Sequence, residues 1–83
     1  MNLTAHVTSR RNGVDIALFN RVAQRTQSVR HGHGRTVTDA LCDALSQSTA
    51  FYVDENVEIA LCVAALRNSQ VELVIKEGMI YAQ

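Results

Sequence analysis

Residues 2–13, Asn-Leu-Thr-Ala-His-Val-Thr-Ser-Arg-Arg-Asn-Gly, decide how the fold begins. Apolar and polar side chains alternate along residues 2–9, and this period of two indicates a strand with one buried face. Asn12-Gly13 then predicts a hairpin turn, because both residue types tolerate positive φ. The apolar side chains of both strands share one face in the resulting register, which pairs Arg11 with Val14, Ser9 with Ile16, and Val7 with Leu18.

A second interpretation of residues 14–18 stays open. Asp15 can cap a helix whose apolar residues follow at helical spacing, so these residues are either strand or helix. Residues 19–29 favour a helix more clearly, because their apolar side chains fall roughly on one side of a helical wheel. The N-terminal region is therefore a lone strand or a hairpin, followed by a helix.

The middle of the chain predicts a break and then a second helix. Residues 30–35 read Arg-His-Gly-His-Gly-Arg, and two glycines within three positions interrupt a helix. Thr36 to Asp39 resembles a capping box. Apolar residues then recur at i, i+3, i+4, i+7 and i+8, which predicts an amphipathic helix over residues 37–47.

The C-terminal half predicts a buried helix and a second hairpin. Residues 59–66 are eight consecutive apolar residues rich in alanine, which favours a helix buried on all sides, with Asp54 as its N-cap; a strand over residues 57–63 is the alternative. The hairpin turns at Glu77-Gly78, joins residues 71–76 to 79–82, and pairs Ile75 with Ile80 and Leu73 with Ala82.

These elements predict an α+β domain spanning residues 1–83. Its small antiparallel sheet consists of the N-terminal strand or hairpin plus the C-terminal hairpin, packed against two or three helices. The apolar content is 47% and the net charge is zero, which excludes a disordered chain. Two cysteines are too few for a disulfide scaffold, and the chain has neither a membrane-spanning run nor a signal peptide. We therefore expect a soluble cytoplasmic protein.

Charge is distributed unevenly along this neutral chain. Residues 1–41 carry six arginines and two aspartates, whereas residues 42–83 carry two basic and six acidic residues. Seven of the eight basic residues are arginine, which favours planar, bidentate contacts. A basic surface of this kind suits nucleic acid or an acidic protein; the alternative is that charges of both halves interleave over an ordinary solvated surface.

The candidate binding residues follow from this arginine distribution and from the glycine-rich segment. Glycines before a helix N-terminus can cradle a phosphate that arginines grip, although the same segment also fits a plain turn. The candidates for contact with a partner or a phosphate are Arg10, Arg11, Arg21, Arg25, Arg30, His31, His33 and Arg35. A second candidate interface is apolar and consists of Val74, Met79 and Tyr81, on the outer face of the C-terminal hairpin.

The chain shows no strong signature of an enzyme, a metal site or a cofactor site. Cys42 and Cys62 lie in apolar helical stretches and are expected to be buried and inert, and Asp43 beside Cys42 disfavours an activated thiol. His31 and His33 would need further ligands to hold a metal. We expect neither catalytic residues, nor a metal, nor a cofactor.

The functional prediction is therefore a small, non-enzymatic binding or regulatory protein. It would dock on a protein or a protein–nucleic-acid complex as an inhibitor or adaptor, and compact inhibitors of phage or mobile-element origin have this size and composition. The first alternative is a nucleic-acid-binding module that uses the arginine-rich N-terminal half, and the second is a nucleotide or phosphate site at the His-Gly-His-Gly segment. Because the core is made of small side chains, we also expect a homodimer.

Overall fold

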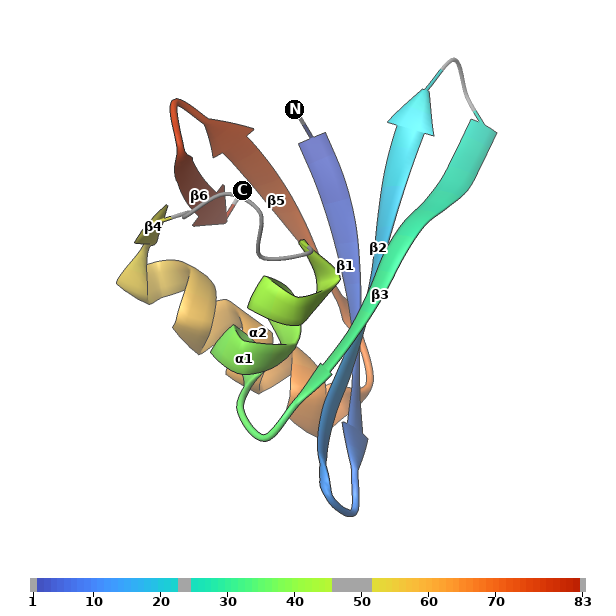
Figure 1. Cartoon of the computed structure of the whole chain (residues 1–83), viewed down its shortest axis with the longest axis vertical. Coiled ribbons are helices and arrows are strands. Elements are labelled where there is room, and N and C mark those ends of the chain that lie inside the picture. The colour runs from blue at the N-terminus through green and yellow to red at the C-terminus, as the bar shows by residue number, and fades with distance from the viewer. Residues whose placement is uncertain (1, 23–24, 46–51, 83) are drawn as a thin grey trace.

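The computed structural model describes residues 2–22, 25–45 and 52–82, and of residues 21–22, 25–29 and 52 only the backbone. This part of the chain forms one mixed sheet and two helices, which confirms the α+β class (Figure 1). The strands are β1 (Asn2–Arg10), β2 (Gly13–Val22), β3 (Arg25–Gly34), β4 (Tyr52–Val53), β5 (Gln70–Lys76) and β6 (Met79–Ala82), and the helices are α1 (Val37–Ala44) and α2 (Glu55–Arg67).

The sheet is larger than the sequence predicts, because six strands join it in the order β3-β2-β1-β5-β6-β4. Neighbouring strands are antiparallel except β4, which runs parallel to β6. Both helices lie on the same side of the sheet (Figure 1). Apolar residues of both helices and of four strands share one buried cluster, so one face of the sheet is covered and the other is open.

The first hairpin exists, but its predicted register is wrong. The turn consists of Arg11 and Asn12, so Arg10 pairs with Gly13 and Val7 pairs with Ile16. The difference from the prediction is two residues, so the same side chains still face the core. Gly13 has φ +146°, and a methyl group there would collide with the carbonyl oxygen of the neighbouring strand, so glycine is required as a strand residue after the turn.

The helix predicted over residues 19–29 is wrong, and so is the break at residues 30–35. Residues 13–22 and 25–34 are β2 and β3, which form a second long hairpin. A shift in register between Leu18 and Phe19 marks a bulge in this ladder. A few apolar residues at helical spacing are a weak signal, and pairing of β2 with both β1 and β3 overrides it.

The glycines of β3 are where α1 packs on the sheet. A methyl group at Gly32 would lie 2.7 Å from Ala44 Cα and closer still to two backbone atoms of α1. A methyl group at Gly34 would lie 2.6 Å from Asp39 Cβ. Because Ala40 and Ala44 are themselves small and buried, α1 approaches β3 almost backbone to backbone.

Both helices in the second half of the prediction are present. Thr36 caps α1, since its hydroxyl accepts a hydrogen bond from the backbone N–H of Asp39 at 3.1 Å. Asp54 occupies the N-cap position of α2, although its side chain makes no capping hydrogen bond. The alternative strand over residues 57–63 is therefore wrong. Neither described helix is long and apolar enough to cross a bilayer.

The expectation that α2 is buried on all sides is wrong. One face of α2 is buried in the core, whereas Ile59, Val63 and Leu66 are exposed. Eight consecutive apolar residues occupy every side of a helix, and the described part of the chain packs against only one side of α2.

The second hairpin is confirmed in turn and register. Glu77 and Gly78 separate β5 from β6, and Ile75 pairs with Ile80. Both turn residues have positive φ, at 54° and 78°, which is the backbone of a type I′ turn.

Candidate partner-binding site

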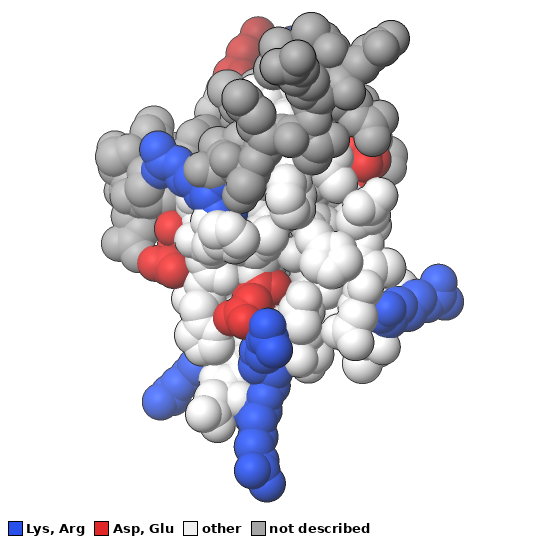
Figure 2. Space-filling model, turned by 90° about the vertical axis from the view of Figure 1, so that its right-hand side faces the viewer, with Lys and Arg blue, Asp and Glu red and all other residues white. Residues whose placement is uncertain are grey.

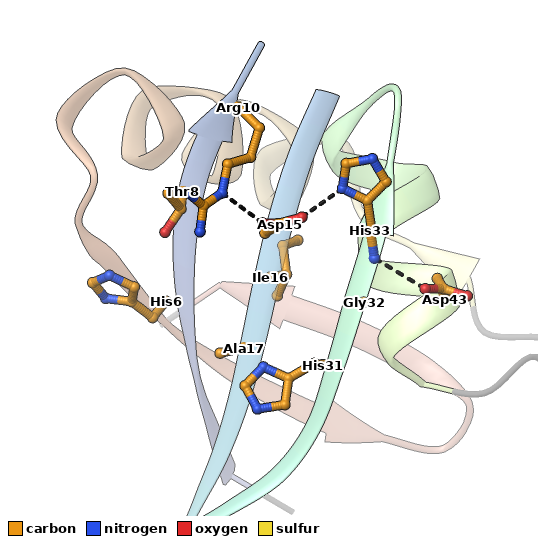
Figure 3. Close-up of a pocket in the computed structure, with 10 residues that line it drawn as sticks. All are labelled: His6, Thr8, Arg10, Asp15, Ile16, Ala17, His31, Gly32, His33 and Asp43. Carbon is orange, nitrogen blue, oxygen red and sulfur yellow. Dashed lines mark hydrogen bonds and ion pairs between the residues drawn. The ribbon is translucent and has the colours of Figure 1, made fainter. Parts of the chain in front are cut away.

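The open face of the sheet holds a shallow hollow over β1, β2 and β3. Its volume is about 460 Å³, and Figure 3 shows its lining. Most of the lining side chains come from the three neighbouring strands, and one comes from α1. The lining residues are His6, Thr8, Arg10, Asp15, Ile16, Ala17, His31, Gly32, His33 and Asp43.

The strand register explains why these side chains meet. Ala17 pairs with His6 on one side and with His31 on the other, so two imidazoles flank a methyl group across three strands (Figure 3). In the next row, Asp15 lies between Thr8 and His33. The side chain of Ala17 is much smaller than the two imidazoles beside it, so the surface is recessed between His6 and His31.

The carboxylate of Asp15 contacts the side chains of His33 and Arg10, in the upper part of Figure 3. Its Oδ1 lies 2.5 Å from His33 Nδ1, and its Oδ2 lies 2.7 Å from Arg10 Nε. The hydrogen bond from His33, and then that from Arg10, lowers the pKa of Asp15 below the usual aspartate value. All three side chains are more than a third exposed, so solvent screens these contacts and they orient side chains rather than stabilise the fold strongly.

A second contact ties the hollow to α1. The backbone N–H of His33 donates a hydrogen bond to Asp43 Oδ2 at 2.9 Å. β3 is an edge strand of the described sheet, so this N–H points away from the ladder. Asp43 therefore satisfies an edge donor and fixes the position of α1 beside His33.

Three chain segments that each carry an exposed arginine come together at one end of the molecule. The β1–β2 turn carries Arg11, and the link from β3 to α1 carries Arg35. A methyl group at Gly13 would lie only 3.3 Å from Arg35 Cα, which shows how close the turn and the link are. The C-terminal end of α2 reaches the same end, because the backbone N–H of Ser9 donates to Asn68 Oδ1 at 3.4 Å, directly after Arg67.

Arg11, Arg35 and Arg67 are all exposed, and none forms an ion pair with another described residue. Figure 2 shows basic side chains projecting separately from the lower half of the face that it presents, with acidic side chains between them. We call these three residues, with Arg10, the basic end.

The predicted binding residues divide between different places. Arg10, Arg11 and Arg35 lie at the basic end, His31 and His33 lie in the hollow, and Arg30 is exposed further along β3. Arg21 and Arg25 belong to β2 and β3 at the opposite end of that hairpin, and their side chains lie outside the described residues. Among the four N-terminal arginines whose side chains are described, Arg30 lies apart from the other three.

The glycine-rich segment is not the open loop that the sequence predicts. His31 and His33 point to the open face, while Gly32 and Gly34 face α1 at close range. The glycines therefore allow α1 to pack closely on β3, and α1 occupies the space beside their backbone where the sequence analysis placed a phosphate. The alternation of histidine and glycine is itself a strand pattern, with the glycines at the positions that face the core and the histidines at those that face outward.

The residues of the predicted apolar interface lie on β5 and β6, which are separated from β2 and β3 by β1. Val74 pairs with Tyr81 across β5 and β6, and the Tyr81 hydroxyl donates to Met79 Sδ at 3.2 Å. Tyr81 is 40% exposed, whereas Val74 and Met79 are half-buried. The three residues lie together on the open face, as the alternation predicts.

Sequence reasoning missed several members of the hollow and misplaced both thiols. His6, Thr8 and Ala17 follow from the period-two pattern once β2 and β3 are recognised, and Asp15 is a strand residue instead of a helix cap. Cys42 and Cys62 are exposed, so the expectation of buried thiols is wrong. Within the described residues no group of three or more His, Cys, Asp or Glu side chains is arranged to hold a metal ion.

Comparisons with protein-family models, with curated proteins and with solved structures found no match. The site must therefore be interpreted from its own geometry. An open sheet face with an ion-paired hollow and a neighbouring arginine-rich end offers contacts to a surface.

Proposed function

We propose that the protein is a non-enzymatic binding protein that docks on a protein partner through its basic end and the adjoining hollow. The observation that carries the proposal is that the three chain segments carrying Arg11, Arg35 and Arg67 come together at one end of the molecule. Arginine favours bidentate contact with carboxylates. The fitting partner is a protein surface whose carboxylates face Arg11, Arg35 and Arg67 and avoid the carboxylates of Asp15 and Asp43 in the hollow.

Acidic residues close to the basic end support a protein partner over nucleic acid. Asp15 pairs with Arg10, and Asp39 and Asp43 are exposed on α1 close to the same end. A regular array of phosphates would be repelled by these carboxylates, whereas a shaped protein surface can avoid them. The mixture of signs in Figure 2 agrees with this preference.

Comparative capture tests the proposal. Three immobilised baits are compared for the proteins that they retain from host lysate at moderate salt. The baits are the wild type, the Arg11→Glu/Arg35→Glu variant and an Arg30→Glu control. Arg30 is an exposed arginine away from the basic end, so its reversal shows whether a charge change elsewhere on the surface also alters the proteins that are retained. We expect an acidic protein that binds the wild type and the control but not the double variant. Retention of the same proteins by all three baits would contradict the proposal.

Nucleic-acid binding is the second candidate, because the same three guanidinium groups could neutralise phosphates. Affinity for nucleic acid falls steeply with salt in proportion to the number of phosphates contacted. Fluorescence anisotropy with a labelled duplex and a labelled single strand at low salt tests this candidate directly. Binding that disappears in the Arg11→Glu/Arg35→Glu variant would favour nucleic acid, and an unchanged anisotropy at all protein concentrations would exclude it.

A further inference from the structure

Helix α2 carries an exposed apolar stripe in addition to the face that it buries. Ile59, Cys62, Val63 and Leu66 follow at i, i+3, i+4 and i+7, so they form one row along the helix. All four are exposed, and Leu66 is 87% accessible. This is the spacing of a helix-packing seam, and such a row facing water marks an interaction surface. We call these four residues the α2 stripe.

We propose that the α2 stripe binds the α2 stripe of a second copy of this chain, with the two helices antiparallel about a twofold axis. The stripe is nearly symmetric about its centre. Antiparallel pairing sets Ile59 against Leu66 of the second copy, and it brings Cys62 and Val63 close to their own counterparts at the axis. A twofold interface needs such a self-complementary surface.

The charges of α2 favour this occupant and this orientation. The first turn carries Glu55 and Glu58, and the last turn carries Arg67. In an antiparallel pair the acidic turn of each helix lies beside the basic turn of the other, and the helix dipoles also oppose one another. A parallel pair would place acidic turns together. The area buried would also add to a core that is small in an 83-residue domain.

The inference does not depend on the proposed function, because its test uses only the purified chain. Cys62 reports on the twofold axis, and Cys42, exposed on α1 outside the stripe, provides a matched control. Cys42→Ser leaves Cys62 as the single thiol, and Cys62→Ser leaves Cys42. After oxidation with diamide, we expect Cys42→Ser to give a covalent dimer on a non-reducing gel, and Cys62→Ser to remain a monomer.

Sedimentation equilibrium then measures the noncovalent dimer. Leu66→Glu places a charge on the most exposed member of the stripe, and we expect the dissociation constant to rise at least tenfold. Gln70→Glu, which adds the same charge to an exposed position of β5, should leave it within twofold. Circular dichroism of both variants establishes that they are folded.

Orientation is tested by combining two charges. Ile59→Lys and Leu66→Glu in one chain face each other twice across an antiparallel interface, so the double variant should dimerise more tightly than either single variant. In a parallel pair like charges would meet, and the double variant would be the weakest. The proposal is overturned if the wild type is monomeric throughout the concentration range, if both cysteine variants cross-link equally, or if the double variant is the weakest.

Discussion

Substitution of Gly32 by alanine tests the close contact between α1 and β3. The φ of Gly32 lies outside the left-handed region, so alanine causes no backbone strain there, and space alone decides the outcome. The added methyl group would lie 2.7 Å from Ala44 Cα and closer to the carbonyl oxygen of Ala40. These are backbone atoms, so a rotamer change cannot relieve the overlap and α1 must move away from the sheet.

The expected loss follows from the cost of overpacking. Extra carbon in a filled core costs about 1–3 kcal/mol, and the upper part of this range applies because a helix backbone has to move. In a domain of this size each kcal/mol lowers the melting temperature by roughly 4–8 °C. We therefore expect Gly32→Ala to lower the unfolding free energy by about 2–3 kcal/mol and the melting temperature by about 8–24 °C.

Urea denaturation and thermal melting followed by circular dichroism measure this change. Ala17→Val is the matched control, because it adds carbon to the neighbouring strand on the open face, at the floor of the hollow. Its effect should stay within about 0.5 kcal/mol. Where space is available, replacing glycine by alanine stabilises a protein by about 0.4–1 kcal/mol through the unfolded chain. A stabilised Gly32→Ala protein would therefore refute the packing of α1 on Gly32.

Three further substitutions test local features. Glu77→Asn should raise the unfolding free energy by about 0.5–1 kcal/mol in urea titrations, because asparagine tolerates the positive φ of this turn position better than glutamate; an unchanged or lower value would contradict the turn geometry. Asp15→Asn should lower the melting temperature slightly at pH 7 but not near pH 2. The lowered pKa of Asp15 gives stability that is present above about pH 4 and is lost as the carboxylate protonates. A difference in melting temperature that persists at pH 2 would show that the ionised carboxylate is not its cause. Thr36→Ala should lower the unfolding free energy by about 1 kcal/mol in thermal melts, because the α1 cap is lost. Thr36→Ser keeps the hydroxyl and should retain most of that stability; equal losses in the two variants would argue against the cap.

The elements that the sequence predicts well are those whose signal is local. The β5–β6 hairpin follows from alternation around Glu77-Gly78, and α1 follows from its cap and its apolar spacing. In both cases the residues that give the signal are also the ones that make the contacts. The pairing of Ile75 with Ile80 could therefore be predicted without any knowledge of the rest of the chain.

The elements that the sequence predicts poorly depend on contacts between distant segments. β2 gains its partners on both sides only when the sheet assembles, so its backbone is fixed by β1 and β3 and not by its own propensity. The same holds for the exposed side of α2. Eight apolar residues predict burial, but the number of neighbours available to Ile59 and Leu66 is set by the size of the domain.

The segment from His31 to Gly34 combines both kinds of information. Its two inward positions are glycine, so the apolar pattern that usually marks a strand is missing even though the alternation is complete. Close packing of α1 fixes these inward positions, and it places Asp43 where it holds the backbone of His33. The outward histidines line the hollow on the open face and do not enter the contact between the glycines and α1. Substitutions at the outward positions should therefore change the lining of the hollow without disturbing the packing of α1 on Gly32 and Gly34.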